Sequence, residues 1–69
     1  MNQEIKQKLA INVKQLRMEK KLKREELSLL LGVDNSYISK LEKCKINITL
    51  DKLILIADYF NVPFVRLFK

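Results

Sequence analysis

Three polar residues that can form hydrogen bonds, Asn35, Ser36 and Lys40, lie close together in a segment that is otherwise rich in helix formers. An asparagine amide can bond adenine N6 and N7 as a pair, and a serine hydroxyl can donate or accept. A lysine one helical turn further on reaches guanine or a phosphate. This combination predicts a surface that contacts the edges of nucleic-acid bases.

The charge balance also favours an anionic partner. Fourteen Lys and Arg residues against eight Asp and Glu residues give the 69-residue chain a formal charge of +6. Other kinds of basic protein share this excess, so the charge supports nucleic-acid binding without establishing it.

Several other classes of protein fit the composition poorly. The chain has no histidine, and the one cysteine, Cys44, forms neither a zinc site nor an intrachain disulfide. The one glycine, Gly32, cannot form a phosphate-binding loop. We therefore expect no enzyme, no metal, no cofactor and no small-molecule substrate. The polar N-terminus and the lack of a long apolar run predict a cytoplasmic protein that does not enter a membrane.

The elements that must position these residues are helices, because strand-like alternation is nowhere sustained. Gly32 should end one helix, while Asp34 and Thr49 are suitable N-caps for the helices that follow them. We expect an all-α fold in a single domain over 1–69. Its five predicted helices span about 2–20, 24–31, about 35–43, 50–60 and a short segment that opens at Pro63.

The apolar residues recur at helical spacing and define the predicted core. The inward-facing positions are Ile5, Leu9, Val13, Leu16, Leu27, Leu30, Leu31, Ile38, Leu41, Leu50, Leu53, Ile56, Ala57, Phe60 and Leu67.

Two short helices joined by a turn that contains glycine form a helix-turn-helix unit, here over 24–43. The segment 22–45, LKREELSLLLGVDNSYISKLEKCK, resembles the Cro/C1-type (XRE-like) helix-turn-helix family, as do the flanking segments 13–17 and 53–63. The resemblance implies a compact, five-helix, lambda-repressor-like DNA-binding domain whose second and third helices read DNA. Asp34, the segments 37–39 and 47–49, and Glu42 are similar in particular to controller proteins of restriction–modification systems.

The resemblance also implies roles for individual residues. The positions that match base-reading residues are Asn35, Ser36, Tyr37, Ser39 and Lys40, although Tyr37 has packing against the preceding helix as an equal alternative. Those that match phosphate contacts are Arg24, Lys43, Lys45 and Asn47. Arg17 and Glu42 match a buried ion pair between the first and third helices. Lys21 and Cys44 stand where the family commonly has glycine, and the Cys44 position is one that favours positive φ.

The C-terminal third contains more apolar side chains than its helices need for a core. We expect Leu55, Tyr59, Phe64, Val65 and Phe68 to form the interface of a homodimer, which would also stabilise so small a domain. The alternative is that the core absorbs Phe64 and Phe68.

These observations predict a sequence-specific, dimeric transcriptional regulator that binds double-stranded DNA at a roughly palindromic operator. The resemblance points to the autoregulatory controller of a restriction–modification operon. The alternative is an antitoxin-like or phage-repressor-like protein that acts largely through a protein partner, with Leu55, Tyr59, Phe64 and Phe68 as the contact surface.

Overall fold

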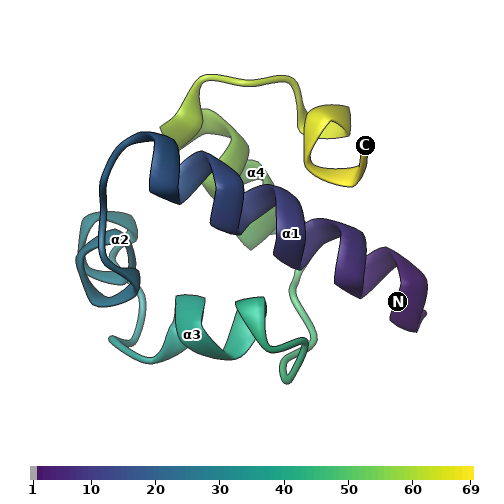
Figure 1. The fold of residues 1–69 in the computed structure, drawn as a ribbon, viewed down its shortest axis with the longest axis horizontal. Helices are drawn as coiled ribbons and strands as arrows, with labels where there is room; N and C mark the ends of the chain where they lie inside the picture. Colours follow the sequence, from purple (N-terminus) through teal and green to yellow (C-terminus); the bar gives the residue numbers. More distant parts are fainter. Residues whose placement is uncertain (1) are drawn as a thin grey trace.

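The computed structural model describes residues 2–69, and its regular elements are all helical (Figure 1). They are the α-helices α1 (Gln3–Glu19), α2 (Arg24–Leu31), α3 (Tyr37–Glu42) and α4 (Leu50–Phe60), and the 3-10 helix η1 (Phe64–Phe68). The predicted all-α class is confirmed. The fifth helix differs from the other four in being a short 3-10 turn after Pro63.

Side chains at the helix starts explain where the helices begin. The side chain of Asn2 accepts the Ile5 N–H at 2.8 Å before α1, and the hydroxyl of Thr49 accepts the Lys52 N–H at 3.2 Å before α4. Glu26 in the first turn of α2 accepts the Lys23 N–H at 2.8 Å. Each contact satisfies an N–H that the helix itself leaves without a partner.

The four α-helices end in the same way, at a residue with left-handed backbone. These residues are Lys21 (φ 57°), Gly32 (φ 73°), Cys44 (φ 60°) and Asn61 (φ 55°). After each of them, the next N–H bonds back to the carbonyl five residues earlier, as in Val33 N–H to Ser28 C=O at 3.0 Å. This is the Schellman arrangement. The positive φ expected at the Cys44 position is confirmed.

The start of α3 differs from the prediction. The helix begins at Tyr37 rather than Asn35, and Asn35 and Ser36 lie in the turn before it. Asp34 caps this turn, because its carboxylate accepts both the N–H of Ser36, at 3.1 Å, and the Ser36 hydroxyl. The Tyr37 N–H bonds to the Asp34 carbonyl at 2.9 Å, so the chain makes a tight turn before the α-helical pattern starts.

The core is formed by apolar side chains from all five elements. It contains Leu9, Val13, Leu16, Leu27, Leu31, Ile38, Leu41, Leu53, Ile56, Ala57, Phe60 and Leu67. Three predicted core residues are instead exposed: Ile5 (41%), Leu30 (55%) and Leu50 (62%). Ile5 and Leu50 lie at the first turns of α1 and α4, beyond the core. Leu30 points outward because Ser28 shares the buried face of α2 with Leu27 and Leu31.

Candidate nucleic-acid interface

Helices α2 and α3 pack against each other at the corner of the molecule that lies beneath one end of α1 (Figure 1). Leu27 and Ile38, one from each helix, are fully buried. The turn between the helices holds Gly32, whose left-handed backbone reverses the chain. The pair therefore forms the predicted helix-turn-helix, with the exposed side of α3 and its preceding turn facing outward.

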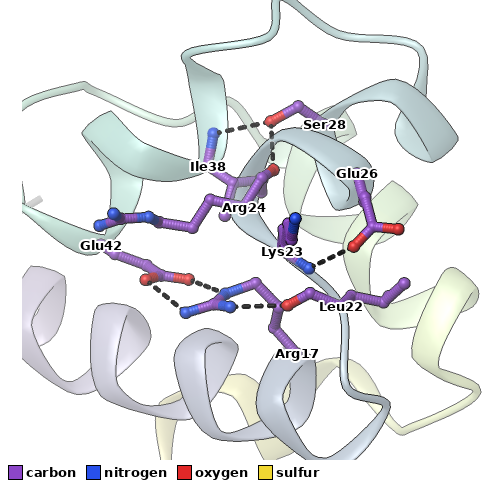
Figure 2. A network of polar contacts seen from close by, with 8 residues as sticks. All are labelled: Arg17, Leu22, Lys23, Arg24, Glu26, Ser28, Ile38 and Glu42. Carbon is purple, nitrogen blue, oxygen red and sulfur yellow. Dashed lines mark hydrogen bonds and ion pairs between the residues drawn. The ribbon is translucent and has the colours of Figure 1, made fainter.

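A serine that the sequence analysis did not single out joins the two helices. Ser28 is fully buried, its hydroxyl donates to the Arg24 carbonyl at 3.0 Å, and it accepts the N–H of Ile38 at 3.2 Å (Figure 2). The sequence signal was weak, since a small polar residue among leucines is equally compatible with an exposed position.

The Arg17 guanidinium and the Glu42 carboxylate form a two-pronged ion pair between α1 and α3 (Figure 2). Arg17 Nε lies 2.7 Å from Glu42 Oε2, and the second contact, to Oε1, is 3.2 Å. A third guanidinium nitrogen donates to the Leu22 carbonyl at 2.7 Å. The two side chains are only 12% and 5% exposed, so the pair fixes α3 against α1 from inside the protein.

Four of the nine predicted DNA-contacting residues line one groove of about 690 Å³ where α1, α2 and the turn before α3 meet. They are Arg24, Asn35, Ser36 and Ser39. The other lining residues are Lys14, Arg17, Met18, Lys23 and Glu25. Lys14 and Lys23 were not among the predicted contacts, because their positions on α1 and before α2 gave no sequence signal beyond that of ordinary exposed lysines. The charge of Arg17 is balanced by Glu42, so Lys14, Lys23 and Arg24 remain as cations against the one carboxylate of Glu25. This excess of positive charge makes the groove suited to an anion.

The remaining predicted DNA-contacting residues lie outside this groove. Lys40 is exposed on α3, and Lys43, Lys45 and Asn47 are exposed just beyond its C-terminal end. Tyr37 is half-buried and packs against the core. Its burial raises the pKa of the Tyr37 phenol above the usual value.

The turn that carries Asn35 and Ser36 is stabilised by the charge of Asp34. The hydrogen bonds that its carboxylate accepts from the Ser36 hydroxyl and backbone N–H lower the pKa of Asp34, and the nearby charge of Lys40 lowers it further. The carboxylate is therefore ionised at neutral pH and holds the turn in a fixed shape.

The predicted interface residues lie on α4 and η1, which pack against each other. Leu55, Phe64 and Val65 are exposed, whereas Tyr59 and Phe68 are half-buried against the core. The ring centroids of Phe64 and Phe68 are 5.6 Å apart. The core thus absorbs part of Phe68 and leaves Phe64 at the surface.

A buried amide attaches η1 to the middle of α1. Asn12 Nδ2 donates to the Leu67 carbonyl at 2.8 Å and lies 3.5 Å from that of Arg66. Leu67 beside it is fully buried. These contacts place Phe64, Val65 and Phe68 on a surface that is fixed relative to the core.

Residues 2–69 contain no group of His, Cys, Asp or Glu side chains arranged to hold a metal ion. Within the same range, no helix is long and apolar enough to cross a membrane.

Comparisons with known proteins agree with this geometry. Residues 13–67 match the helix-turn-helix family HTH_3. The chain is similar to the control protein C.SmaI of Serratia marcescens, with 34% identity over 64 residues that cover 93% of this chain and 76% of that protein.

Two solved structures are also similar. The hypothetical transcription factor NHTF from Neisseria aligns with a TM-score of 0.89 and 29% identity, over 94% of this chain and 75% of that one. The restriction-modification controller protein C.AhdI from Aeromonas hydrophila aligns with a TM-score of 0.83 and 28% identity, over 91% of this chain and 96% of that one.

Proposed function

The chain belongs to the Cro/C1-type helix-turn-helix family, and from this premise we propose how it acts as a DNA-binding transcriptional regulator. The observation that carries the proposal is the basic groove at the α2–α3 corner, which gathers Arg24, Asn35, Ser36 and Ser39 on one face. No catalytic role is part of the proposal, and the named relatives are regulators rather than enzymes.

The turn before α3 and the exposed side of α3 enter the major groove. Asn35, Ser36, Ser39 and Lys40 contact base edges, and Tyr37 contributes from the edge of the core. Asn35 and Ser36 suit this role because Asp34 holds their turn in one shape while the Asn35 side chain stays exposed.

Basic residues on both sides of the reading surface bind the phosphate backbone. Arg24, at the first turn of α2, adds its charge to a helix N-terminus that favours anions in itself. Lys43, Lys45 and Asn47 follow α3 on the other side. Lys14 and Lys23 line the groove next to Arg24 and extend the first phosphate contact.

The regulator binds as a homodimer through α4 and η1. The interface consists of the exposed Leu55, Phe64 and Val65 and the half-buried Tyr59 and Phe68. Covering these apolar side chains with a second apolar surface removes them from water, which favours association. A two-fold dimer places its two reading surfaces about 34 Å apart, one turn of DNA, and binds a roughly palindromic operator.

The regulated genes belong to a restriction–modification operon. The support is that C.SmaI is named a control protein and C.AhdI a restriction-modification controller protein. The chain then controls its own operon and works in the cytoplasm, where that DNA lies.

The test is selection of bound duplexes from a random DNA pool, followed by binding measurements on the selected duplex. Asn35→Ala should lose affinity at particular base positions, whereas Lys45→Ala should weaken binding to all sequences about equally. The affinity of the wild type and of both variants should fall steeply as the salt concentration rises, because phosphate contacts release counterions. Unchanged sequence preference in Asn35→Ala would remove this residue, and the turn that holds it, from the reading surface.

A second candidate function is action through a protein partner, as in antitoxin-like members of the family. The observation that favours it is apolar surface outside the proposed dimer interface: Leu29 on α2 is 79% exposed and Leu30 beside it is also exposed. Mass measurement of the purified protein discriminates the two, since a stable homodimer favours the first function and a monomer favours the second.

A further inference from the structure

The first turn of α3 lacks the cap that helices usually receive from the residue before them. Ser36 occupies the N-cap position, yet its side chain makes no capping bond, because its hydroxyl donates to Asp34 instead. An N–H in the first turn of a helix has no partner within the helix and must find one elsewhere. In α3, the buried Ile38 N–H finds it on another helix, at the hydroxyl of Ser28.

We propose that Ser28 caps the reading helix from α2 and thereby sets the position of α3 for base recognition. Its hydroxyl accepts the Ile38 N–H at 3.2 Å and donates to the Arg24 carbonyl at 3.0 Å (Figure 2). One oxygen therefore links the backbone of α3 to the first residue of α2. Ser28 is a positioning residue: it is fully buried and touches no DNA itself.

The placement of this link explains why it bears on recognition. Arg24, whose carbonyl accepts the hydroxyl proton, is the proposed phosphate contact. Ile38, whose N–H is held, lies between the proposed base-reading residues Ser36 and Ser39. The hydroxyl thus joins the backbone at a phosphate contact to the backbone next to base contacts, and its directional hydrogen bonds fix the angle of α3. The burial of Leu27 and Ile38 is not directional and does not fix this angle by itself.

The inference rests on the proposed function, and its test uses the duplex that the wild-type protein selects from a random pool, with a scrambled duplex of equal length as the non-specific probe. Ser28→Ala should lower affinity for the selected duplex about tenfold, because only a fraction of the free protein then holds α3 in the binding orientation. Affinity for the scrambled duplex should change less than about twofold, since phosphate contacts dominate it.

Two further variants separate positioning from stability. Ile56→Val removes one buried methylene from α4 and leaves the Ser28 hydrogen bonds in place. It should weaken folding while leaving the ratio of specific to non-specific affinity unchanged. Ser28→Thr keeps the hydroxyl and should keep that ratio. Equal loss of both affinities in Ser28→Ala, or loss of the ratio in a folded Ser28→Thr, would overturn the proposal.

Amide hydrogen exchange supplies a readout that does not depend on DNA. The Ile38 amide should be protected in the wild type and in Ser28→Thr, and should exchange at least about tenfold faster in Ser28→Ala relative to the core amides of α4. Unprotected Ile38 in the wild type overturns the proposal even if Ser28→Ala does not fold. If the wild type selects no DNA sequence, the proposed function fails, and the Ile38 comparison still decides whether the hydroxyl holds α3.

Discussion

The α2–α3 corner and the C-terminal end of the molecule are held in place by different kinds of contact. At the corner, the Ser28 hydroxyl and the Arg17–Glu42 ion pair connect three helices through buried polar bonds. At the C-terminal end, α4 and η1 meet mainly through apolar side chains, with the Asn12 amide as a polar attachment to α1.

The exposed side chains of the two regions also differ in polarity. The turn before α3 and α3 itself expose polar and basic side chains such as Asn35 and Lys40, and the exposed apolar residues of the corner, Leu29 and Leu30, lie on α2. The C-terminal end exposes Phe64 and Val65. Hydrogen bonds are directional and fix the angle of a helix, while apolar contacts fix mainly its distance. In this protein the buried polar bonds between helices are concentrated where the proposed function depends on the orientation of a helix.

The largest expected effect on stability comes from breaking the Arg17–Glu42 ion pair at the corner. Glu42→Gln leaves the Arg17 guanidinium buried without its counter-charge, and we expect a loss of about 3–5 kcal/mol in the free energy of unfolding. Urea denaturation measures it. The double variant Arg17→Met/Glu42→Leu is the control and should lose less, because no unpaired charge remains. A loss in Glu42→Gln below about 1 kcal/mol would contradict a structural role for the pair.

The amide at the opposite end should have a smaller effect. Asn12→Leu leaves the Leu67 carbonyl buried without a donor, which costs about 1–3 kcal/mol in the same measurement. Asn12→Asp is closer in shape but cannot donate, so it should destabilise at least as much. If Asn12→Asp were as stable as the wild type, the hydrogen bond from this amide would not be what attaches η1 to α1. The attachment of η1 would then rest on its apolar contacts.

The exposed apolar surface should matter for association rather than for folding. Val65→Glu should change the stability of the monomer by less than about 0.5 kcal/mol, because Val65 is 53% exposed. It should nevertheless raise the dissociation constant of the proposed dimer, since a charge would be buried there. Sedimentation over a range of concentrations measures this. Leu29→Glu, at an apolar position on α2 that is 79% exposed, is the control outside the proposed interface and should leave association unchanged.

The smallest effect concerns pH at the turn before α3. The pKa of Asp34 lies below its usual 3.8, so its contribution to stability is complete above that value and is lost only as pH falls through the lower, folded pKa. The turn should therefore stay intact from neutral pH down to about pH 4. NMR titration of the Asp34 carboxyl checks this. In Ser36→Ala the pKa should move up towards 3.8, and an unchanged titration would show that Ser36 does not hold the carboxylate.

Local signals predicted most of the helix boundaries. The structure has α2 at 24–31 and α4 at 50–60, as the acidic first turn, Gly32 and Thr49 indicated. The start of α3 was placed two residues too early, because Asp34 caps a tight turn rather than the helix itself. Sequence alone does not distinguish these two uses of an aspartate.

Tertiary contacts were harder to predict. The partnership of Arg17 with Glu42 came from family resemblance, since nothing in their spacing requires them to meet. Ser28 and Leu30 were misplaced for the same reason. Either residue could share the buried face of α2 with Leu27 and Leu31, and hydrophobicity alone favours the leucine. In the structure Ser28 is the buried residue, and its hydroxyl accepts a hydrogen bond from the Ile38 N–H of α3.

The stability of the protein can be raised at two of the residues with left-handed backbone that end the four α-helices. A side chain other than glycine or asparagine costs about 1–2 kcal/mol in this conformation, and two of the four positions, Lys21 and Cys44, bear that cost. Both lie in loops at the ends of helices, where a glycine would keep the same backbone path. Lys21→Gly and Cys44→Gly are therefore routes by which the heat resistance of this small protein can rise without any change to its core.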